Sequence, residues 1–153
     1  MASGIPRLSK DLKELVFSED PSISAFPESC DMLHWVATIT GVKETVYEGL
    51  KYKLTIEFTD KYPYEAPTVK FKTPCYHPNV DTKGNICLDI LTKDKWVSTF
   101  TVRTLLLSLQ SLLGDPNLRD PLNTQAADLW KNKKEFIRTL QEYHQKNSLK
   151  ETN

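Results

Sequence analysis

The chain has 153 residues, the size of one domain, and its 39% hydrophobic and 26% charged residues are typical of a soluble globular protein. Twenty Lys and Arg balance twenty Asp and Glu, so the net charge indicates no bulk attraction to nucleic acid or to an acidic membrane. The N-terminus holds no apolar run of signal-peptide length, and no window reaches the roughly 18 apolar residues of a membrane span. We therefore expect a single intracellular domain over residues 1–153.

The first predicted element is a helix that ends before Asp20-Pro21. Ser3 is its expected cap, and its apolar stripe recurs at helical spacing through Leu8, Leu12, Leu15 and Val16. Arg7 and Lys10 are predicted on its exposed side. Residues 21–31 are interpreted as an extended connector.

Three strands are predicted next, over residues 33–39, 50–58 and 69–71. In each of them apolar and polar residues alternate with period 2, which is typical of a half-buried sheet. Strands so close in sequence favour an antiparallel meander with one dry face and one wet face.

Residues 75–96 break this pattern and are interpreted as an ordered loop on the core. Three helices follow, over residues 102–113, 123–130 and from 132 onward. The first is dense in leucine and is predicted to lie across the sheet. Asn123 is expected to cap the second helix, and Asn132 with Glu135 resembles a capping box for the third. Strands followed by helices indicate an α+β domain.

Cys87 is the candidate nucleophile of the 75–96 loop. It follows polar sequence and precedes Asp89, an unusual setting for a core cysteine. A thiol can form a covalent acyl intermediate, although a free cysteine is also a common core residue. Cys30 and Cys75 are expected to be structural. The spacings of Cys and His suggest no metal site, and none is predicted.

Five further residues of the chain can assist or shape this site. His77 followed by Pro78 favours a rigid turn whose imidazole bonds to backbone, although a thiol-protease dyad would use the same ring as a base. Asn79 can stabilise an oxyanion or form a turn. Asp89 and Asp120 can accept a hydrogen bond from an amine or serve as loop and cap carboxylates. On these residues alone, a cysteine acyl carrier and a plain binding domain are supported about equally.

Taken together, these residues resemble the ubiquitin-conjugating enzymes over nearly the whole chain. The specific segments are residues 77–79, 84–91 and Trp96, with residues 62–67 upstream and 112–117 downstream. Residues 23–29, 45–48, 73–81 and 102–104 are similar to the cell-cycle carriers that work with the anaphase-promoting complex.

The resemblance implies an α+β fold with an N-terminal helix, a four-stranded antiparallel meander sheet, an active-site loop, a crossing helix and two C-terminal helices. The fourth strand, which periodicity does not reveal, is then expected near residues 69–72 or from a division of residues 46–58.

The resemblance also implies a mechanism. Cys87 would take the C-terminal glycine of ubiquitin from the activating enzyme as a thioester and pass it to a lysine amine or a ligase cysteine. Asn79 would steady the loop and the oxyanion, and Asp89 and Asp120 would orient the lysine. ATP is used by the activating enzyme, so this chain is expected to need no cofactor.

Partner surfaces are implied in the same way. Five residues match the surface that the activating enzyme and a ligase share, namely Arg7, Lys10, Tyr64, Ser98 and Thr99. Leu107 and Ser111 match the face that receives the carried ubiquitin, and Ser24 matches the site of a second, non-covalent ubiquitin. A RING ligase such as the anaphase-promoting complex and substrate proteins complete the partners of a monomer in the cytoplasm and nucleus.

Two alternatives share this fold. One is a carrier for another ubiquitin-like modifier, although the SUMO carrier is strongly basic and the net charge here is zero. The other is a non-catalytic ubiquitin-binding scaffold, which lacks the active cysteine, whereas Cys87 is present.

Overall fold

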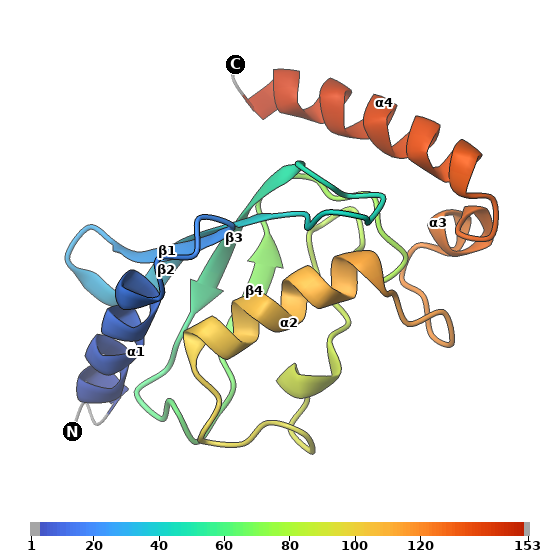
Figure 1. The fold of residues 1–153 in the computed structure, drawn as a ribbon. Helices are drawn as coiled ribbons and strands as arrows, with labels where there is room; N and C mark the ends of the chain where they lie inside the picture. The colour runs from blue at the N-terminus through green and yellow to red at the C-terminus, as the bar shows by residue number, and fades with distance from the viewer. Residues whose placement is uncertain (1–3, 152–153) are drawn as a thin grey trace.

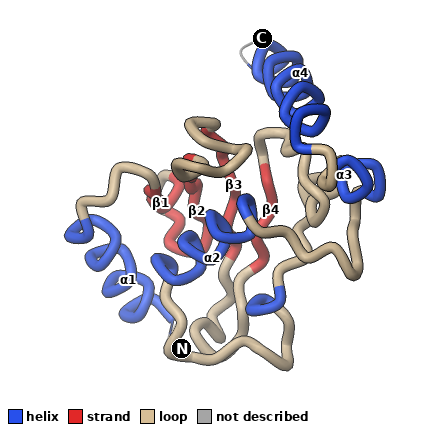
Figure 2. Tube along the Cα trace, turned by 45° about the vertical axis from the view of Figure 1, so that its right-hand side comes forward, coloured by secondary structure: helices blue, strands red, loops and turns tan. Residues whose placement is uncertain are grey.

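Four strands form one antiparallel sheet in the order β1-β2-β3-β4, and a helix crosses one face of it (Figure 1). The computed structural model describes residues 4–151 of the chain, with the side chains of residues 4–147. Helix α2 (Val102–Gly114) lies across the strands, α1 (Gly4–Ser18) packs beside it, and α3 (Thr124–Leu129) and α4 (Lys133–Glu151) lie together at the other end (Figure 2). The predicted α+β class and the meander order are confirmed.

Helix α1 buries a narrower stripe than predicted. Leu8 and Leu15 are buried, but Val16 is 54% exposed, so its assignment to the stripe is wrong. The place between the two leucines is taken by Asp11, which is 1% exposed. Positions 8, 11 and 15 are spaced by three and four residues, so they share one helix face, and Val16 lies beside it. Ser3, the expected cap, is outside the described residues.

Strand β1 (Ile23–Glu28) lies where a connector was predicted. It is the additional strand that the resemblance implied and that the alternation of residues did not reveal. It pairs with β2 (Asp31–Thr40), so that Ile23 is opposite Ile39 and Ala25 is opposite Ala37. The additional strand was expected near residues 69–72 or from a division of residues 46–58, and both positions are wrong, because it precedes β2 in the chain. The strand lies at the sheet edge, where a proline such as Pro27 is tolerated, and only two of its side chains face the core.

The other strands confirm the predicted alternation. Strands β2, β3 (Lys51–Glu57) and β4 (Thr68–Phe71) bury every second side chain on the face that α2 covers. Their fully or nearly fully buried residues are Trp35, Ala37, Ile39, Tyr52, Leu54, Ile56, Val69 and Phe71. This face and the leucines of α2 lie in the core, together with buried residues of α1 and α4 and of the loops between the elements.

The two C-terminal helices begin at polar caps, as predicted. The Oδ1 atom of Asn123 accepts a hydrogen bond from the backbone N of Ala126 at 3.0 Å, at the start of α3. The Oδ1 atom of Asn132 accepts one from the backbone N of Glu135 at 3.3 Å, at the start of α4. The second bond of the capping box is replaced by an ion pair, because Glu135 lies 2.8 Å from Arg138.

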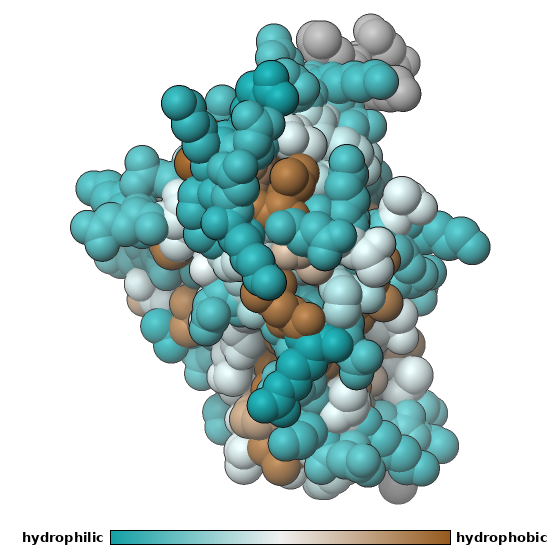
Figure 3. Space-filling view, turned by 90° about the vertical axis from the view of Figure 1, so that its right-hand side faces the viewer, coloured by the Kyte–Doolittle hydropathy of each residue, from teal (hydrophilic) through white to brown (hydrophobic). Residues whose placement is uncertain are grey.

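Helix α4 buries one side only. Phe136 and Leu140 are fully buried, and the ring of Phe136 contacts those of Tyr47, Tyr76 and Trp130. The surface on the side of α3 and α4 is mostly hydrophilic, with small apolar areas (Figure 3). None of the helices within residues 4–151 has the length and apolarity that crossing a membrane requires.

Candidate active site

His77 lies buried at the base of the loop that carries Cys87. Its Nδ1 accepts a hydrogen bond from the backbone N of Asn79 at 2.9 Å, and its Nε2 lies 2.7 Å from the carbonyl O of Leu112 in α2. Because Nδ1 accepts, the proton of the neutral ring is on Nε2, which donates to Leu112. Burial lowers the pKa of His77 to about 4, although the backbone carbonyls of α2 act in the opposite direction. The ring is therefore neutral at pH 7, and neither nitrogen is available as a base for Cys87.

Pro78 and Asn79 join the loop to the segment that follows α2. The carbonyl O of Pro78 accepts hydrogen bonds from the backbone N of Leu122 at 2.8 Å and of Asn123 at 3.0 Å. The amide of Asn79 donates to the carbonyl O of Asn117 at 2.7 Å and accepts from its backbone N at 2.8 Å. Asn79 is 0% exposed, so its side chain is inside this junction.

The turn before Cys87 is fixed against the sheet. Gly84 has φ +86°, and a Cβ placed on it would lie 2.2 Å from the carbonyl O of Phe71 in β4, so only glycine fits. The backbone N of Cys87 then donates to the carbonyl O of Asn79 at 2.9 Å. Leu88 is buried, whereas the side chain of Cys87 is exposed. A rigid backbone thus presents this thiol to solvent.

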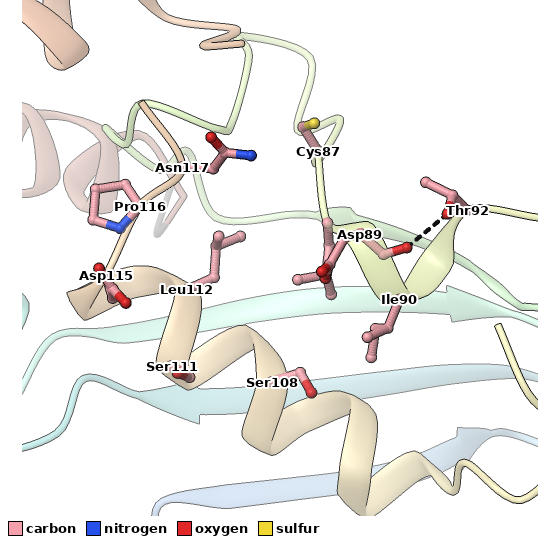
Figure 4. A pocket seen from close by; sticks show the side chains of 11 residues that line it. Cys87, Asp89, Ile90, Thr92, Ser108, Ser111, Leu112, Asp115, Pro116 and Asn117 are labelled. Carbon is pink, nitrogen blue, oxygen red and sulfur yellow. Dashed lines mark hydrogen bonds between the residues drawn. The ribbon is translucent and has the colours of Figure 1, made fainter. Parts of the chain in front are cut away.

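Cys87 opens into a hollow of about 600 Å³ between its own loop and the end of α2. Asp89, which begins the short helix η1 (Asp89–Leu91), lines the hollow on the cysteine side. Ser111 and Asp115 line the opposite wall. Asn117, also on that wall, turns its side-chain nitrogen toward Cys87 across the hollow (Figure 4).

The structure separates the two predicted carboxylates. Asp89 shares the hollow with Cys87, whereas Asp120 is exposed on the 115–123 segment and does not line the hollow. Asp115 and Asn117 do line it, and neither of them was predicted as a site residue. The available signal was their position directly after the end of α2, within one of the segments that resemble the family.

The five residues predicted to bind the activating enzyme and a ligase surround a second hollow, of about 400 Å³. We call this set the partner surface. Arg7 and Lys10 come from α1, Tyr64 from the β3–β4 connection, and Ser98 and Thr99 from the loop before α2. Tyr64 is 76% exposed, which is unusual for a large ring.

Arg7 is not free on the outer side of α1, and that prediction is wrong. Its Nε lies 2.8 Å from Oδ1 of Asp11, its Nη1 donates to the carbonyl O of Ser98 at 2.6 Å, and its Nη2 donates to the carbonyl O of Phe100. Only 19% of the side chain is exposed. Arg7 therefore holds the 97–100 loop against α1.

Asp11 is the buried centre of this junction. Its Oδ2 accepts hydrogen bonds from the hydroxyl of Tyr62 and, at 3.2 Å, from the backbone N of Val102. Burial, followed by the bond to Asp11, raises the pKa of Tyr62 above its usual range. One carboxylate thus fixes α1 to the segment that precedes β4 and to the first residue of α2.

The residues predicted to contact ubiquitin lie on two faces. Leu107 is half-buried and Ser111 is exposed, both on α2. Ser24 is exposed on β1, opposite Thr38 of β2, on the sheet face away from α2. Within residues 4–147, His, Cys, Asp and Glu side chains form no group of three or more that could hold a metal ion.

Comparisons with known proteins agree with the sequence resemblance. The family model described as ubiquitin-conjugating enzyme matches residues 7–144. The chain is 56% identical over 136 residues to "Ubiquitin-conjugating enzyme E2-20 kDa" of Schizosaccharomyces pombe, covering 88% of this chain and 77% of that protein. It is 42% identical over 146 residues to "Ubiquitin-conjugating enzyme E2 N" of Drosophila melanogaster, covering 94% and 96%. A solved structure, "Novel Ubiquitin-Conjugating Enzyme", matches with a TM-score of 0.84 at 38% identity and covers 89% of this chain and 91% of that one.

Proposed function

The chain belongs to the ubiquitin-conjugating enzyme family, and on that premise we propose that Cys87 is the residue that carries ubiquitin. The exposed thiol at the mouth of the 600 Å³ hollow supports this assignment. Cys75 is buried, and burial raises the pKa of its thiol above the usual range. Cys30 is exposed, but it lies in the turn between β1 and β2.

The proposed reaction has two steps. Cys87 loses its thiol proton to solvent, and its thiolate attacks the thioester between ubiquitin and the activating enzyme, so a new C–S bond forms and the activating enzyme leaves as a thiolate. A deprotonated lysine amine, or a ligase thiolate, then attacks the same carbonyl carbon. The C–S bond to Cys87 breaks, and with an amine the nitrogen releases a proton to solvent and an isopeptide remains. Sulfur suits both steps because it is a good nucleophile and a good leaving group.

His77, Pro78 and Asn79 are proposed to position Cys87. Each bonds to a different part of the segment from Leu112 to Asn123, so together they fix the distance between the two walls of the hollow. Asn79 is fully buried and does not line the hollow, so for the predicted contact between its amide and the oxyanion the side chain would have to turn out of its junction with Asn117.

Asp89 is proposed to orient the incoming lysine, because its carboxylate shares the hollow with Cys87. Asp120 is proposed to act on the acceptor from outside the hollow, where its side chain is exposed. A carboxylate next to the approach path favours a cationic amine.

The partner surface is proposed to bind the activating enzyme and a RING ligase. Tyr64 supplies an exposed aromatic anchor, and Lys10, Ser98 and Thr99 supply charge and hydrogen bonds around it. Leu107 and Ser111 are proposed to contact the carried ubiquitin, and Ser24 a second, non-covalent one.

The ligase is proposed to be the anaphase-promoting complex, with a role in cell-cycle protein degradation and a location in the cytoplasm and nucleus. The similarity of residues 23–29, 45–48, 73–81 and 102–104 to the cell-cycle carriers supports this choice. Reconstituted ubiquitination with this ligase and with an unrelated RING ligase tests it. Equal product from both ligases would contradict the choice.

A thioester assay tests the carrier function. The protein is mixed with ubiquitin, activating enzyme and ATP, and gels are run with and without a thiol reductant. We expect a band heavier by one ubiquitin that the reductant removes. Cys87→Ala should abolish the band, whereas Cys30→Ala, the matched change of the other exposed cysteine, should keep it. No band with a charged activating enzyme, or a band that survives in Cys87→Ala, would refute the proposal; a band with another modifier alone would assign the chain to that modifier.

A second assay tests the partner surface. Tyr64→Ala should raise the concentration of activating enzyme needed for half-maximal charging. Phe17→Ala removes a ring that is 78% exposed but lies outside the hollow, and it should leave this concentration unchanged. Equal effects of the two variants would contradict the assignment.

A further inference from the structure

The side-chain amide of Asn79 does not line the hollow that Cys87 opens into. Attack on a thioester carbonyl moves an electron pair onto its oxygen, and a fixed N–H donor lowers the energy of that charge. The Asn79 side chain is fully buried and exchanges two hydrogen bonds with the backbone of Asn117, at 2.7 and 2.8 Å. Its amide therefore holds the wall of the hollow rather than entering it.

Asn117 has the geometry that Asn79 lacks. It lines the hollow that Cys87 opens into, and its side-chain nitrogen is turned toward Cys87 (Figure 4). Its Oδ1 accepts a hydrogen bond from the backbone N of Arg119 at 3.0 Å, which sets which end of the amide faces the cysteine. Within the described part of the chain, Nδ2 of Asn117 makes no hydrogen bond that would occupy it.

The backbone under this side chain is also fixed. Both the N–H and the C=O of Asn117 are bonded to the buried amide of Asn79. The carbonyl of Asn79 in turn accepts from the backbone N of Cys87 at 2.9 Å. Cys87 and Asn117 are thus both bonded to the buried residue Asn79. The distance between the thiol and the Asn117 amide therefore changes little during the reaction, as preorganised stabilisation of an oxyanion requires.

We propose that Asn117 donates a hydrogen bond from Nδ2 to the oxyanion that forms on the thioester carbonyl of Cys87, and that Asn79 positions it. This proposal rests on the proposed function of Cys87. The attacking amine forms a C–N bond while the carbonyl pair moves to oxygen, where Asn117 donates. When the carbonyl re-forms, the C–S bond breaks, sulfur leaves as thiolate, and the nitrogen releases its proton to water.

The test is single-turnover discharge of the preformed thioester, with the activating enzyme stopped. Asn117→Asp keeps an oxygen to accept from Arg119 but removes the N–H donor, and Asn117→Ala removes both. The ubiquitin thioester of each variant is discharged to free lysine and, separately, to hydroxylamine. Two nucleophiles are used because an oxyanion forms, and needs the donor, whichever nucleophile attacks. Leu118→Ala, an exposed neighbour, is the matched control.

We expect both Asn117 variants to slow the maximal discharge rate by about 10–100-fold, by the same factor for lysine and hydroxylamine. Loss of a donor that is shielded from water would slow the reaction by the upper value of this range. The hollow is open, so a water molecule can replace part of the lost hydrogen bonding and the effect is smaller. Leu118→Ala should stay near the wild-type rate. Asn117→Asp within twofold of wild type would show that only the bond to Arg119 matters, and it would overturn the proposal. A slower discharge with lysine but not with hydroxylamine would also overturn the proposal, because it would show that Asn117 binds the lysine acceptor.

These results are distinct from a failure of the carrier function itself. If wild-type protein formed no thioester on Cys87, both proposals would fall together. If the thioester formed and Asn117→Asp discharged it normally, only the role of Asn117 would fall. The unfolding midpoint of each variant is measured alongside, and Asn117→Asp, which keeps the bond to Arg119, carries the conclusion if Asn117→Ala is unstable.

Discussion

The stability of this protein is expected to fall in mild acid because of His77. The folded state holds this ring neutral, with a pKa of about 4 against an ordinary value of 6.5. Below pH 6.5 the unfolded chain therefore binds a proton that the folded chain does not, and this favours unfolding. The loss grows as the pH falls from about 6.5 and levels off below about 4. The shift corresponds to a loss of about 3 kcal/mol in the free energy of unfolding.

Urea unfolding at pH 7, 6, 5 and 4.5 measures this effect in the wild type, His77→Asn and His34→Asn. Asn at position 77 keeps an acceptor near the backbone N of Asn79 but does not titrate. It should be less stable than the wild type by about 1–3 kcal/mol at pH 7 and should lose less stability in acid. Carboxylates titrate in all three proteins, so the difference between wild type and His77→Asn isolates the ring.

His34 is the matched control because it is half-exposed and lies 3.6 Å from Asp31 and 3.7 Å from Glu57. His34→Asn should keep the acid loss that we attribute to His77. The reasoning would be refuted if His77→Asn lost stability as steeply as the wild type, or if His34→Asn alone removed the loss.

Three further predictions follow from particular contacts. Gly84→Ala should lower the free energy of unfolding by about 3 kcal/mol or more, because its Cβ would lie 2.2 Å from a carbonyl oxygen. Gly49→Ala, at φ +79° in open space, should cost only about 1 kcal/mol; equal losses in urea unfolding would contradict this account. Asp11→Ala should cost about 3 kcal/mol because it leaves a partly buried arginine unpaired. Glu14→Ala, on the exposed side, should cost at most about 1 kcal/mol, and a larger loss than for Asp11→Ala would refute this. A thiol reagent followed by mass spectrometry should modify two cysteines quickly and Cys75 only on unfolding, since Cys75 is 4% exposed; rapid labelling of all three would contradict its burial.

Local sequence patterns determined most of the secondary structure. In β2, β3 and β4, period-2 alternation gave the buried face, because successive side chains of a strand point to opposite sides. Asn123 and Asn132 marked helix starts because a cap acts within three residues of itself. Strand β1 was missed because an edge strand with Pro27 and an exposed Phe26 shows no such alternation.

The candidate site was only half visible in the sequence. The resemblance pointed to Cys87 and its loop, and these residues are close together in the chain. The opposite wall of the hollow comes from the end of α2 and the segment after it, where Asp115 and Asn117 lie. That these residues face Cys87 depends on the bonds of His77, Pro78 and Asn79 across the fold.

By itself, the sequence determined the family, the class of fold, the nucleophile to consider and the ends of most elements, because each depends on short-range patterns or on matching motifs. Only the tertiary structure decided which charged side chains are buried. Asp11 and Arg7 look like ordinary surface residues of α1, yet their partners Tyr62, Ser98 and Phe100 are far away in the chain. A charge is stable inside a protein only where such partners replace water, and this replacement depends on which distant segments the fold brings together.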